Sequence, residues 1–261
     1  MSILTKKMLP FKLRAKRHRG NMLVALECGD RTKAEEEFRN AESVIEEAFQ
    51  FLNKYERPEP AALERAGEGE TAVAEQLADF WGIRGGLYRS RGSAVPDGSG
   101  RTDLDIAIKA YDHGSLYESS PRFGLLNSYN TVSRLVLRIL RQPAILEADE
   151  PAPGLEKRML DLLEDAATLI EGQIDKGRAD VAWALADFAM IELLRNGIDL
   201  DSILDQLDQA TLTDKYPFES MLNVIRDLLR AGIHPRERFL RVGEQIRGKL
   251  PEPMKGTPLT T

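Results

Sequence analysis

Apolar residues recur at spacings of three and four along most of the chain. The first clear run consists of Ala34, Phe38, Ala41, Ile45 and Phe49. This spacing places the side chains on one stripe of a helix and predicts a helix over about residues 32–53. Similar runs predict helices around 155–170, 203–210 and 221–229. The sustained alternation typical of strands is missing, so the pattern predicts an all-α fold.

Prolines and glycines separate the predicted helices. A glycine-rich stretch over residues 92–102 has no apolar period and predicts an exposed loop between two helices. The last residues, 251–261, contain three prolines and few apolar positions, which is typical of a disordered tail. The expected organisation is therefore one helical domain over 1–250, with an insert loop at 92–102 and a disordered tail.

The clearest repeat signal is an aromatic residue followed by a small residue and a tyrosine. Its first helix contains Trp81, Gly85 and Tyr88. The second half of the same pattern, beyond the insert, consists of Ala107, Tyr111 and Gly114. This pattern resembles a tetratricopeptide repeat. Small residues at 85, 107 and 114 would let two antiparallel helices approach closely while the aromatic side chains fill the space around them.

The resemblance covers about residues 12–245, with further matches at 12–52 and 181–210. The order of an aromatic-glycine-tyrosine hairpin, an asparagine-bearing helix and a late Trp-Ala-Leu-Ala helix is similar to the helical TRAFs-binding region found with some kinases and bacterial signalling proteins. The resemblance implies antiparallel hairpins stacked as an α-solenoid, with the first helix of each pair facing a concave surface.

Charge is distributed unevenly along the chain. Residues 1–26 contain seven lysines and arginines and no acid, which leaves −13 for the remainder of a chain whose formal net charge is −6. Such polarity can orient a protein against a charged partner. The mild overall charge argues against a nucleic-acid binder that uses the whole protein.

Candidate chemistry is sparse. The segment 82–86 is rich in glycine but lacks the ending of a phosphate loop and follows no strand, so packing explains it better. His18, His113 and His234 lie far from one another and from the single Cys28, so we expect neither a metal site nor a cofactor. Acidic runs on the predicted helices are typical of solvated faces, and no catalytic group stands out.

The resemblance places a set of polar residues on the concave surface, where we expect a partner to bind. The set is Lys12, Lys16, Arg19, Asp79, Arg89, Asn127, Asn130 and Arg134. The alternative is that the basic residues form an ordinary solvated helix face. Asn127, Asn130 and Arg134, which lie at spacings of three and four and which we call the asparagine stripe, would then belong to a normal amphipathic helix.

The sequence thus predicts a non-catalytic adaptor or regulator that binds a protein segment or helix, or forms part of a larger assembly. The alternative is a regulator that binds nucleic acid through its basic N-terminal helix. No apolar run approaches the roughly 18–20 residues that span a bilayer, so we expect a cytoplasmic protein without a membrane partner.

Overall fold

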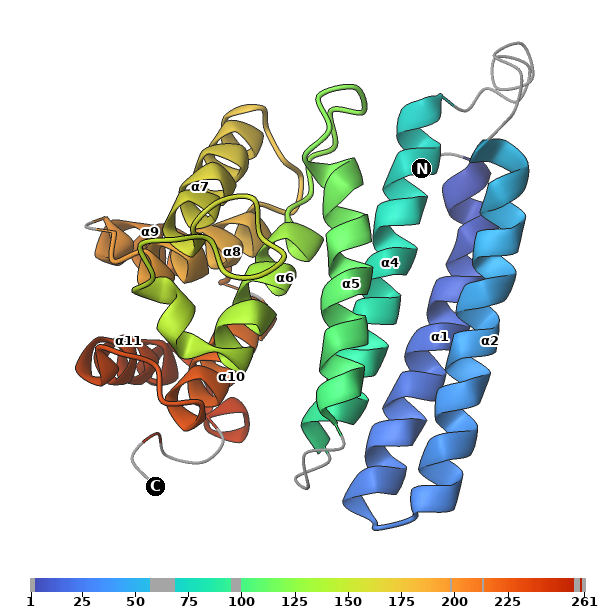
Figure 1. The fold of residues 1–261 in the computed structure, drawn as a ribbon, viewed down its shortest axis with the longest axis horizontal. Coiled ribbons are helices and arrows are strands. Elements are labelled where there is room, and N and C mark those ends of the chain that lie inside the picture. The colour runs from blue at the N-terminus through green and yellow to red at the C-terminus, as the bar shows by residue number, and fades with distance from the viewer. Residues whose placement is uncertain are drawn as a thin grey trace. The chain divides into compact units, whose positions relative to one another are not determined.

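A computed structural model describes residues 3–56, 69–94, 100–197, 199–212, 214–255 and 259. Ten α-helices and two short 3₁₀ turns, but no strand, are present in these ranges (Figure 1). The helices are α1 (Ile3–Glu27), α2 (Arg31–Glu56), α4 (Glu70–Ala94), α5 (Arg101–Glu118), α6 (Tyr129–Arg141), α7 (Met159–Asp175), α8 (Val181–Leu194), α9 (Leu200–Ala210), α10 (Tyr216–Arg230) and α11 (Arg236–Lys249). The predicted all-α fold is confirmed for the described residues.

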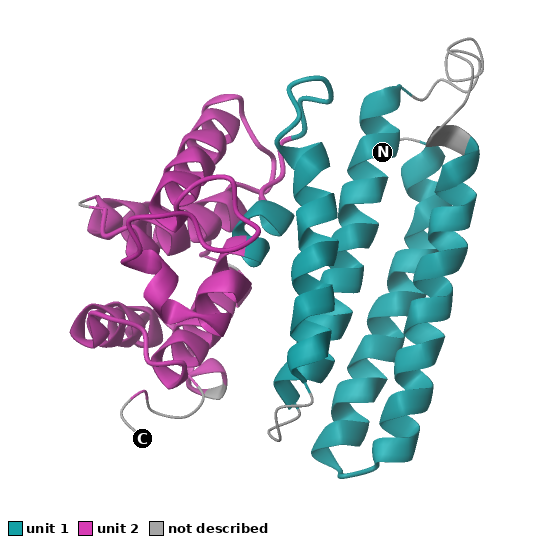
Figure 2. Ribbon diagram, in the orientation of Figure 1, with its two compact units in different colours: residues 1–125, 129–134 teal, residues 126–128, 135–261 magenta. Residues whose placement is uncertain are grey.

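The chain divides into two compact units (Figure 2). Unit 1 comprises residues 1–125 and 129–134, and unit 2 comprises residues 126–128 and 135–261. Helix α6 therefore contributes its first turns to unit 1 and the rest to unit 2. The single helical domain that we expected over residues 1–250 stays a prediction, because this division by internal contacts does not test it.

Unit 1 is built from helices that pair with their sequence neighbours. Helix α1 packs along α2, α4 packs along α5, and α4 also contacts both α1 and α2 (Figure 1). The two helices α4 and α5 approach closely at Gly85, where an added Cβ atom would lie 2.6 Å from the ring of the fully buried Tyr111. The predicted close approach at Gly85 is confirmed.

Aromatic side chains fill the space between these helices. The ring of Trp81 on α4 stacks on His113 of α5 and contacts Phe49 of α2, with centroid distances of 4.6 Å in both cases. Tyr88 packs edge-on against Phe38 of α2 at 5.1 Å. The residues that carry the repeat pattern on α4 thus hold three helices together.

Gly114 has a different neighbour from the one that the repeat pattern predicts. An added Cβ atom would lie 2.3 Å from the side chain of Asn130, on α6, so this glycine makes room for α6 and not for α4. The physical reason is that Gly114 lies on the last turns of α5, where the chain returns to pack the start of α6 into the same unit.

Unit 2 contains α7 to α11 and the C-terminal part of α6. Helix α8 packs against α7, α9 and α10, and α10 pairs with α11. Buried leucines, isoleucines and two methionines follow the predicted stripes on α7, α9 and α10. The first of these helices begins at Met159, four residues after the predicted start at Leu155, because residues 151–158 form turns.

The structure describes parts of both predicted irregular segments. Helix α4 continues to Ala94 and α5 begins at Arg101, so the helices extend into the predicted 92–102 loop, of which 95–99 lie outside the described residues. In the predicted disordered tail, residues 252–254 form a 3₁₀ turn and Leu259 is buried against Gly243. An apolar contact with α11 therefore holds part of this segment.

Candidate functional site

Two of the predicted partner-binding residues pair with each other. Lys12 on α1 forms an ion pair with Asp79 on α4, and both side chains are partly buried. This pair connects two helices of unit 1, so its charges compensate each other at the helix contact. The structure therefore gives Lys12 and Asp79 an internal role.

The predicted asparagine stripe does not form an exposed surface. Asn130 is fully buried, and its side-chain amide donates hydrogen bonds to the Ala78 carbonyl at 3.0 Å and to Glu118 at 2.8 Å. Asn127 precedes α6, and its carbonyl accepts a hydrogen bond from Gln173 at 3.0 Å. Asn127 and Asn130 therefore do not share a helix face, because Asn127 lies before the start of α6. Arg134 is half-buried and lies 3.8 Å from Asp112 on α5.

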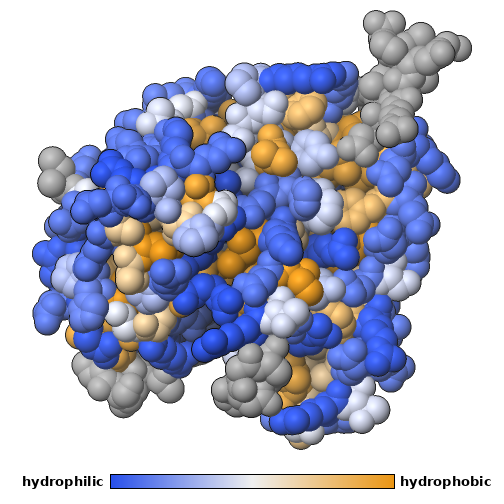
Figure 3. Space-filling model, in the orientation of Figure 1, coloured by the Kyte–Doolittle hydropathy of each residue, from blue (hydrophilic) through white to orange (hydrophobic). Residues whose placement is uncertain are grey.

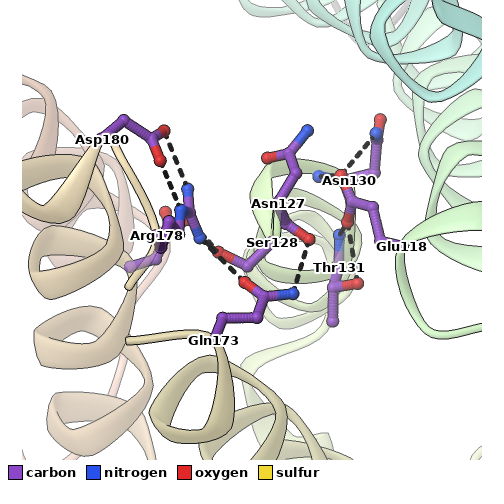
Figure 4. A network of polar contacts seen from close by, with 9 residues as sticks. Glu118, Asn127, Ser128, Asn130, Thr131, Gln173, Arg178 and Asp180 are labelled. Carbon is purple, nitrogen blue, oxygen red and sulfur yellow. Dashed lines mark hydrogen bonds and ion pairs between the residues drawn. The ribbon is translucent and has the colours of Figure 1, made fainter. Parts of the chain in front are cut away.

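Glu118 forms the centre of a buried polar network in unit 1 (Figure 4). Its carboxylate accepts hydrogen bonds from the backbone N–H groups of Asn130 and Thr131 and from both their side chains, at 2.8–3.0 Å. These N–H groups lie in the first turn of α6, where they have no partner within the helix. Burial raises the pKa of Glu118 to about 7, although the four donors act in the opposite direction.

A second network lies in unit 2 (Figure 4). The buried Arg178 guanidinium donates to Ser128 at 2.6 Å, to Gln173 at 3.0 Å and to Asp180 at 2.6 Å. The Ser128 hydroxyl in turn donates to Asp187 at 2.5 Å. Burial raises the pKa of Asp187 to about 6, while Ser128 and Arg178 lower it. Internal hydrogen bonds hold both networks together, although the buried Oδ1 atom of Asn130 has no partner among the described residues, so their role is to join loops and helices.

A third polar cluster surrounds a glycine face of α4 in unit 1. Gly82 and Gly86 lie one turn apart, and an added Cβ atom at Gly86 would lie 3.2 Å from Arg19 Nη1 and 3.6 Å from the Tyr129 hydroxyl. The Tyr129 hydroxyl lies 3.3 Å from that of Tyr111. The Arg19 Nε donates to Ser90 at 2.9 Å. We call this group of residues the Arg19 cluster.

The exposed face of α1 combines cations with apolar side chains. Leu9, Leu13 and Val24 are 42%, 59% and 60% exposed. They share this face with further exposed residues at spacings of three and four: Lys6, Lys16, Arg17 and Gly20. None of these three cations forms an ion pair within the described part of the chain. We call these seven residues the α1 outer face.

Two further site classes are absent from the described ranges. No group of three or more histidine, cysteine or acidic side chains there could hold a metal ion. No helix among those residues is long and apolar enough to cross a membrane. Comparisons of the chain with protein-family models, curated proteins and solved structures found no match.

Sequence reasoning missed the residues that organise both buried networks. Glu118 appears in the sequence as one more acid near a helix end, and no local spacing connects it to Asn130, twelve residues later. Arg178 and Asp187 likewise meet only through the packing of unit 2. The one local signal is Ser128, a residue type favoured directly before a helix, although its hydroxyl donates to Asp187 here.

Proposed function

We propose that the chain is a non-catalytic interaction protein that binds an acidic, amphipathic segment of a partner protein on the α1 outer face. The observation that carries this proposal is the mixture of exposed leucines and valine with lysines and arginine that have no carboxylate partner among the described residues. On the face drawn in Figure 3, apolar residues lie in small groups among polar ones.

The chemistry of this surface favours a helical or extended peptide over a small molecule. Apolar side chains at Leu9, Leu13 and Val24 follow the spacing that an amphipathic partner helix presents along its own apolar stripe. The flanking cations favour carboxylates on the rim of such a partner and speed its approach. Gly20 leaves open space on the same face, which allows a close approach of a partner backbone.

We further propose that the two hairpins of unit 1 stack as tetratricopeptide repeats do. Two observations support this proposal: α4 contacts both helices of the preceding pair, and the small residue at 85 lies at the contact between α4 and α5. Such hairpins are common supports for peptide binding. The proposed partner surface nevertheless lies on the outer face of α1 and not on the predicted stripe of asparagines.

The proposal can be tested by affinity purification from the native host with wild-type chain and a double charge reversal, Lys16→Glu with Arg17→Glu. We expect a partner with an acidic segment to be retained by the wild type at low salt, and to be lost in the double variant with the fold intact. The matched control is Arg39→Glu, because Arg39 is an exposed cation on α2 of the same unit.

Several results would contradict the proposal. Equal retention of the partner by the wild type and the double variant would exclude the α1 outer face. Recovery of nucleic acid that depends on Lys16 and Arg17 would favour the nucleic-acid alternative, because phosphate contacts produce a steep loss of binding as salt rises. Loss of the partner in the Arg39 control as well would show that only the overall charge matters.

A further inference from the structure

We propose that the Arg19 cluster is an oxyanion-binding site that takes a phosphoryl or carboxylate group. The site is formed by α1, α4, α5 and the first turn of α6, all within unit 1. It is distinct from the α1 outer face, because Arg19 points toward α4 while Lys16 and Arg17 point to solvent.

The guanidinium of Arg19 is held in a fixed position. Its Nε donates to the Ser90 hydroxyl at 2.9 Å, and that hydroxyl donates to the Gly86 carbonyl at 2.8 Å. Ser90 is therefore oriented by α4 itself and in turn orients Arg19. An arginine fixed in this way has little conformational freedom left to lose on binding. The donors on its two η nitrogens are therefore pre-organised.

The positive charge of Arg19 has no counterion among the residues that the structure describes. Arg19 forms no ion pair and no hydrogen bond other than that to Ser90 within the described residues. By comparison, Lys12 and Arg14 on the same helix pair with Asp79 and Glu47. A partly buried guanidinium without a carboxylate favours an anion from outside, and its planar fork suits two oxygen atoms of one group.

Neighbouring groups add donors and positive charge. The hydroxyl groups of Tyr111 and Tyr129 lie 3.3 Å apart, and Tyr129 is 43% exposed, so the cluster has a side open to solvent. Arg89 lies on the same face of α4 as Gly82 and Gly86, one turn beyond Gly86. Burial holds the pKa of the Tyr111 hydroxyl well above its usual value despite the opposing charges of Arg89 and Arg19, so Tyr111 stays a hydrogen-bond donor.

The two glycines on α4 make this arrangement possible. An added Cβ atom at Gly82 would lie 3.1 Å from the Tyr129 ring, and one at Gly86 would lie 3.2 Å from Arg19. Without them, the tyrosine ring and the guanidinium could not lie directly on the helix backbone. The segment 82–86, which is no phosphate loop, thereby supplies the floor of the proposed site.

The experiment is a titration of the full chain with inorganic phosphate and, separately, with acetate, followed by amide NMR shifts and calorimetry. We expect at least one of the two anions to bind with shifts centred on Gly82 and Gly86. Arg19→Gln should weaken binding about tenfold or more, because a charge-assisted hydrogen bond is lost. Tyr129→Phe should weaken it several-fold while leaving the ring packing in place.

The matched control is Arg17→Gln, which removes one positive charge from the exposed side of the same helix. It should leave the affinity for the anion within about twofold, because exposed charges at a distance are screened. The relative strength of phosphate and acetate distinguishes a phosphoryl ligand from a carboxylate ligand. The proposal is overturned if neither anion binds, or if Arg17→Gln weakens binding as much as Arg19→Gln. Unchanged binding in both Arg19→Gln and Tyr129→Phe would also overturn it.

Discussion

The absence of a side chain at Gly85 allows α4 and α5 to approach closely. At Gly85 an added Cβ atom would lie 2.6–2.8 Å from three atoms of the Tyr111 ring, and Tyr111 is fully buried. A ring enclosed in this way cannot move aside without disturbing its neighbours. Gly20 provides the opposite case, since it lies in an exposed helix interior with nothing within 4 Å of its Cβ position.

These two glycines predict opposite effects of the same substitution. Gly85→Ala should lower the free energy of unfolding by roughly 1–3 kcal/mol, because the added methyl group overpacks the α4–α5 contact. Gly20→Ala should raise it by up to about 1 kcal/mol, because alanine restricts the unfolded chain and favours the helix. Urea denaturation of both variants measures the difference. A Gly85→Ala protein as stable as the wild type would show that this contact is wrongly placed.

Glu118 predicts a pH dependence of stability. Its pKa is raised from about 4.5 in the unfolded chain to about 7 in the folded protein, so the folded state binds a proton more tightly. The favourable contribution of this proton is complete below pH 4.5 and is lost as the pH rises through about 7. The shift corresponds to a loss of about 3 kcal/mol across that interval. Urea denaturation at several pH values measures it.

Glu118→Gln should abolish this slope and provides its control. Asp187, whose pKa is raised to about 6, contributes a slope of the same sign but mostly below pH 6. The comparison is therefore sharpest between pH 6 and pH 7, where the wild type should lose stability and the variant should not. Parallel curves for the two proteins in that interval would contradict the assignment to Glu118.

At the scale of helices, the regular spacing of apolar residues predicted most of the helices. The residues at which the helices begin and end depend on packing. The repeat resemblance begins at about residue 12, yet helix α1 begins at Ile3 and continues through Pro10. Leu4 and Met8 are fully buried, and this burial holds the first turns in place although Pro10 cannot donate its backbone hydrogen bond. Such burial cannot be read from the local sequence, because it depends on contacts with residues far along the chain.

One ion pair connects α4 to α5 beside the loop that joins them. Arg91 donates to both carboxylate oxygens of Asp103 at 2.7 Å, and its guanidinium lies 3.4 Å from the centre of the Phe38 ring on α2. Two parallel hydrogen bonds and a ring contact hold this arginine in one geometry. It stabilises three helices at the end of unit 1.

A double-mutant cycle on Arg91 and Asp103 should give a coupling free energy of about 1–2 kcal/mol. This value exceeds that of a typical exposed pair because both side chains are mostly buried and the hydrogen bonds are bidentate. Arg91→Lys should lose part of the coupling, since lysine cannot reproduce the fork. A coupling near zero, with both single variants folded, would mean that the pair contributes nothing beyond its packing.

At the scale of the whole molecule, the all-α fold class could be predicted from the sequence, whereas the positions of the candidate partner-binding residues could not. The helical content and the pairing of neighbouring helices were predicted from period and from the Trp81–Tyr88 pattern. The division into two units was not, because α6 carries one continuous apolar stripe although its ends belong to different units. Of the eight predicted partner-binding residues, Asn130 became core because Gly82 and Gly114 leave space for it.

The unequal distribution of charge connects the fold to the proposed function. The N-terminal 26 residues carry +7, their charged residues lie on α1, and three of the cations are exposed on the α1 outer face with no ion-pair partner in the described part of the chain. Ion pairs with Asp79 on α4 and Glu47 on α2 neutralise Lys12 and Arg14. Arg19 faces α4, whereas the cations of the α1 outer face are directed outward, where they are available to a partner of opposite sign.

The most direct test of this account is site-specific photo-crosslinking in the native host, with the photoreactive residue at position 13 in place of Leu13. The matched site is Glu46, an exposed position on α2 of the same unit. The account predicts a crosslinked protein at position 13 whose captured segment is acidic and amphipathic, no such product at position 46, and loss of the product when Lys16 and Arg17 are reversed to glutamate. Equal crosslinking at both positions, or a product at position 13 that survives the charge reversal, would contradict it.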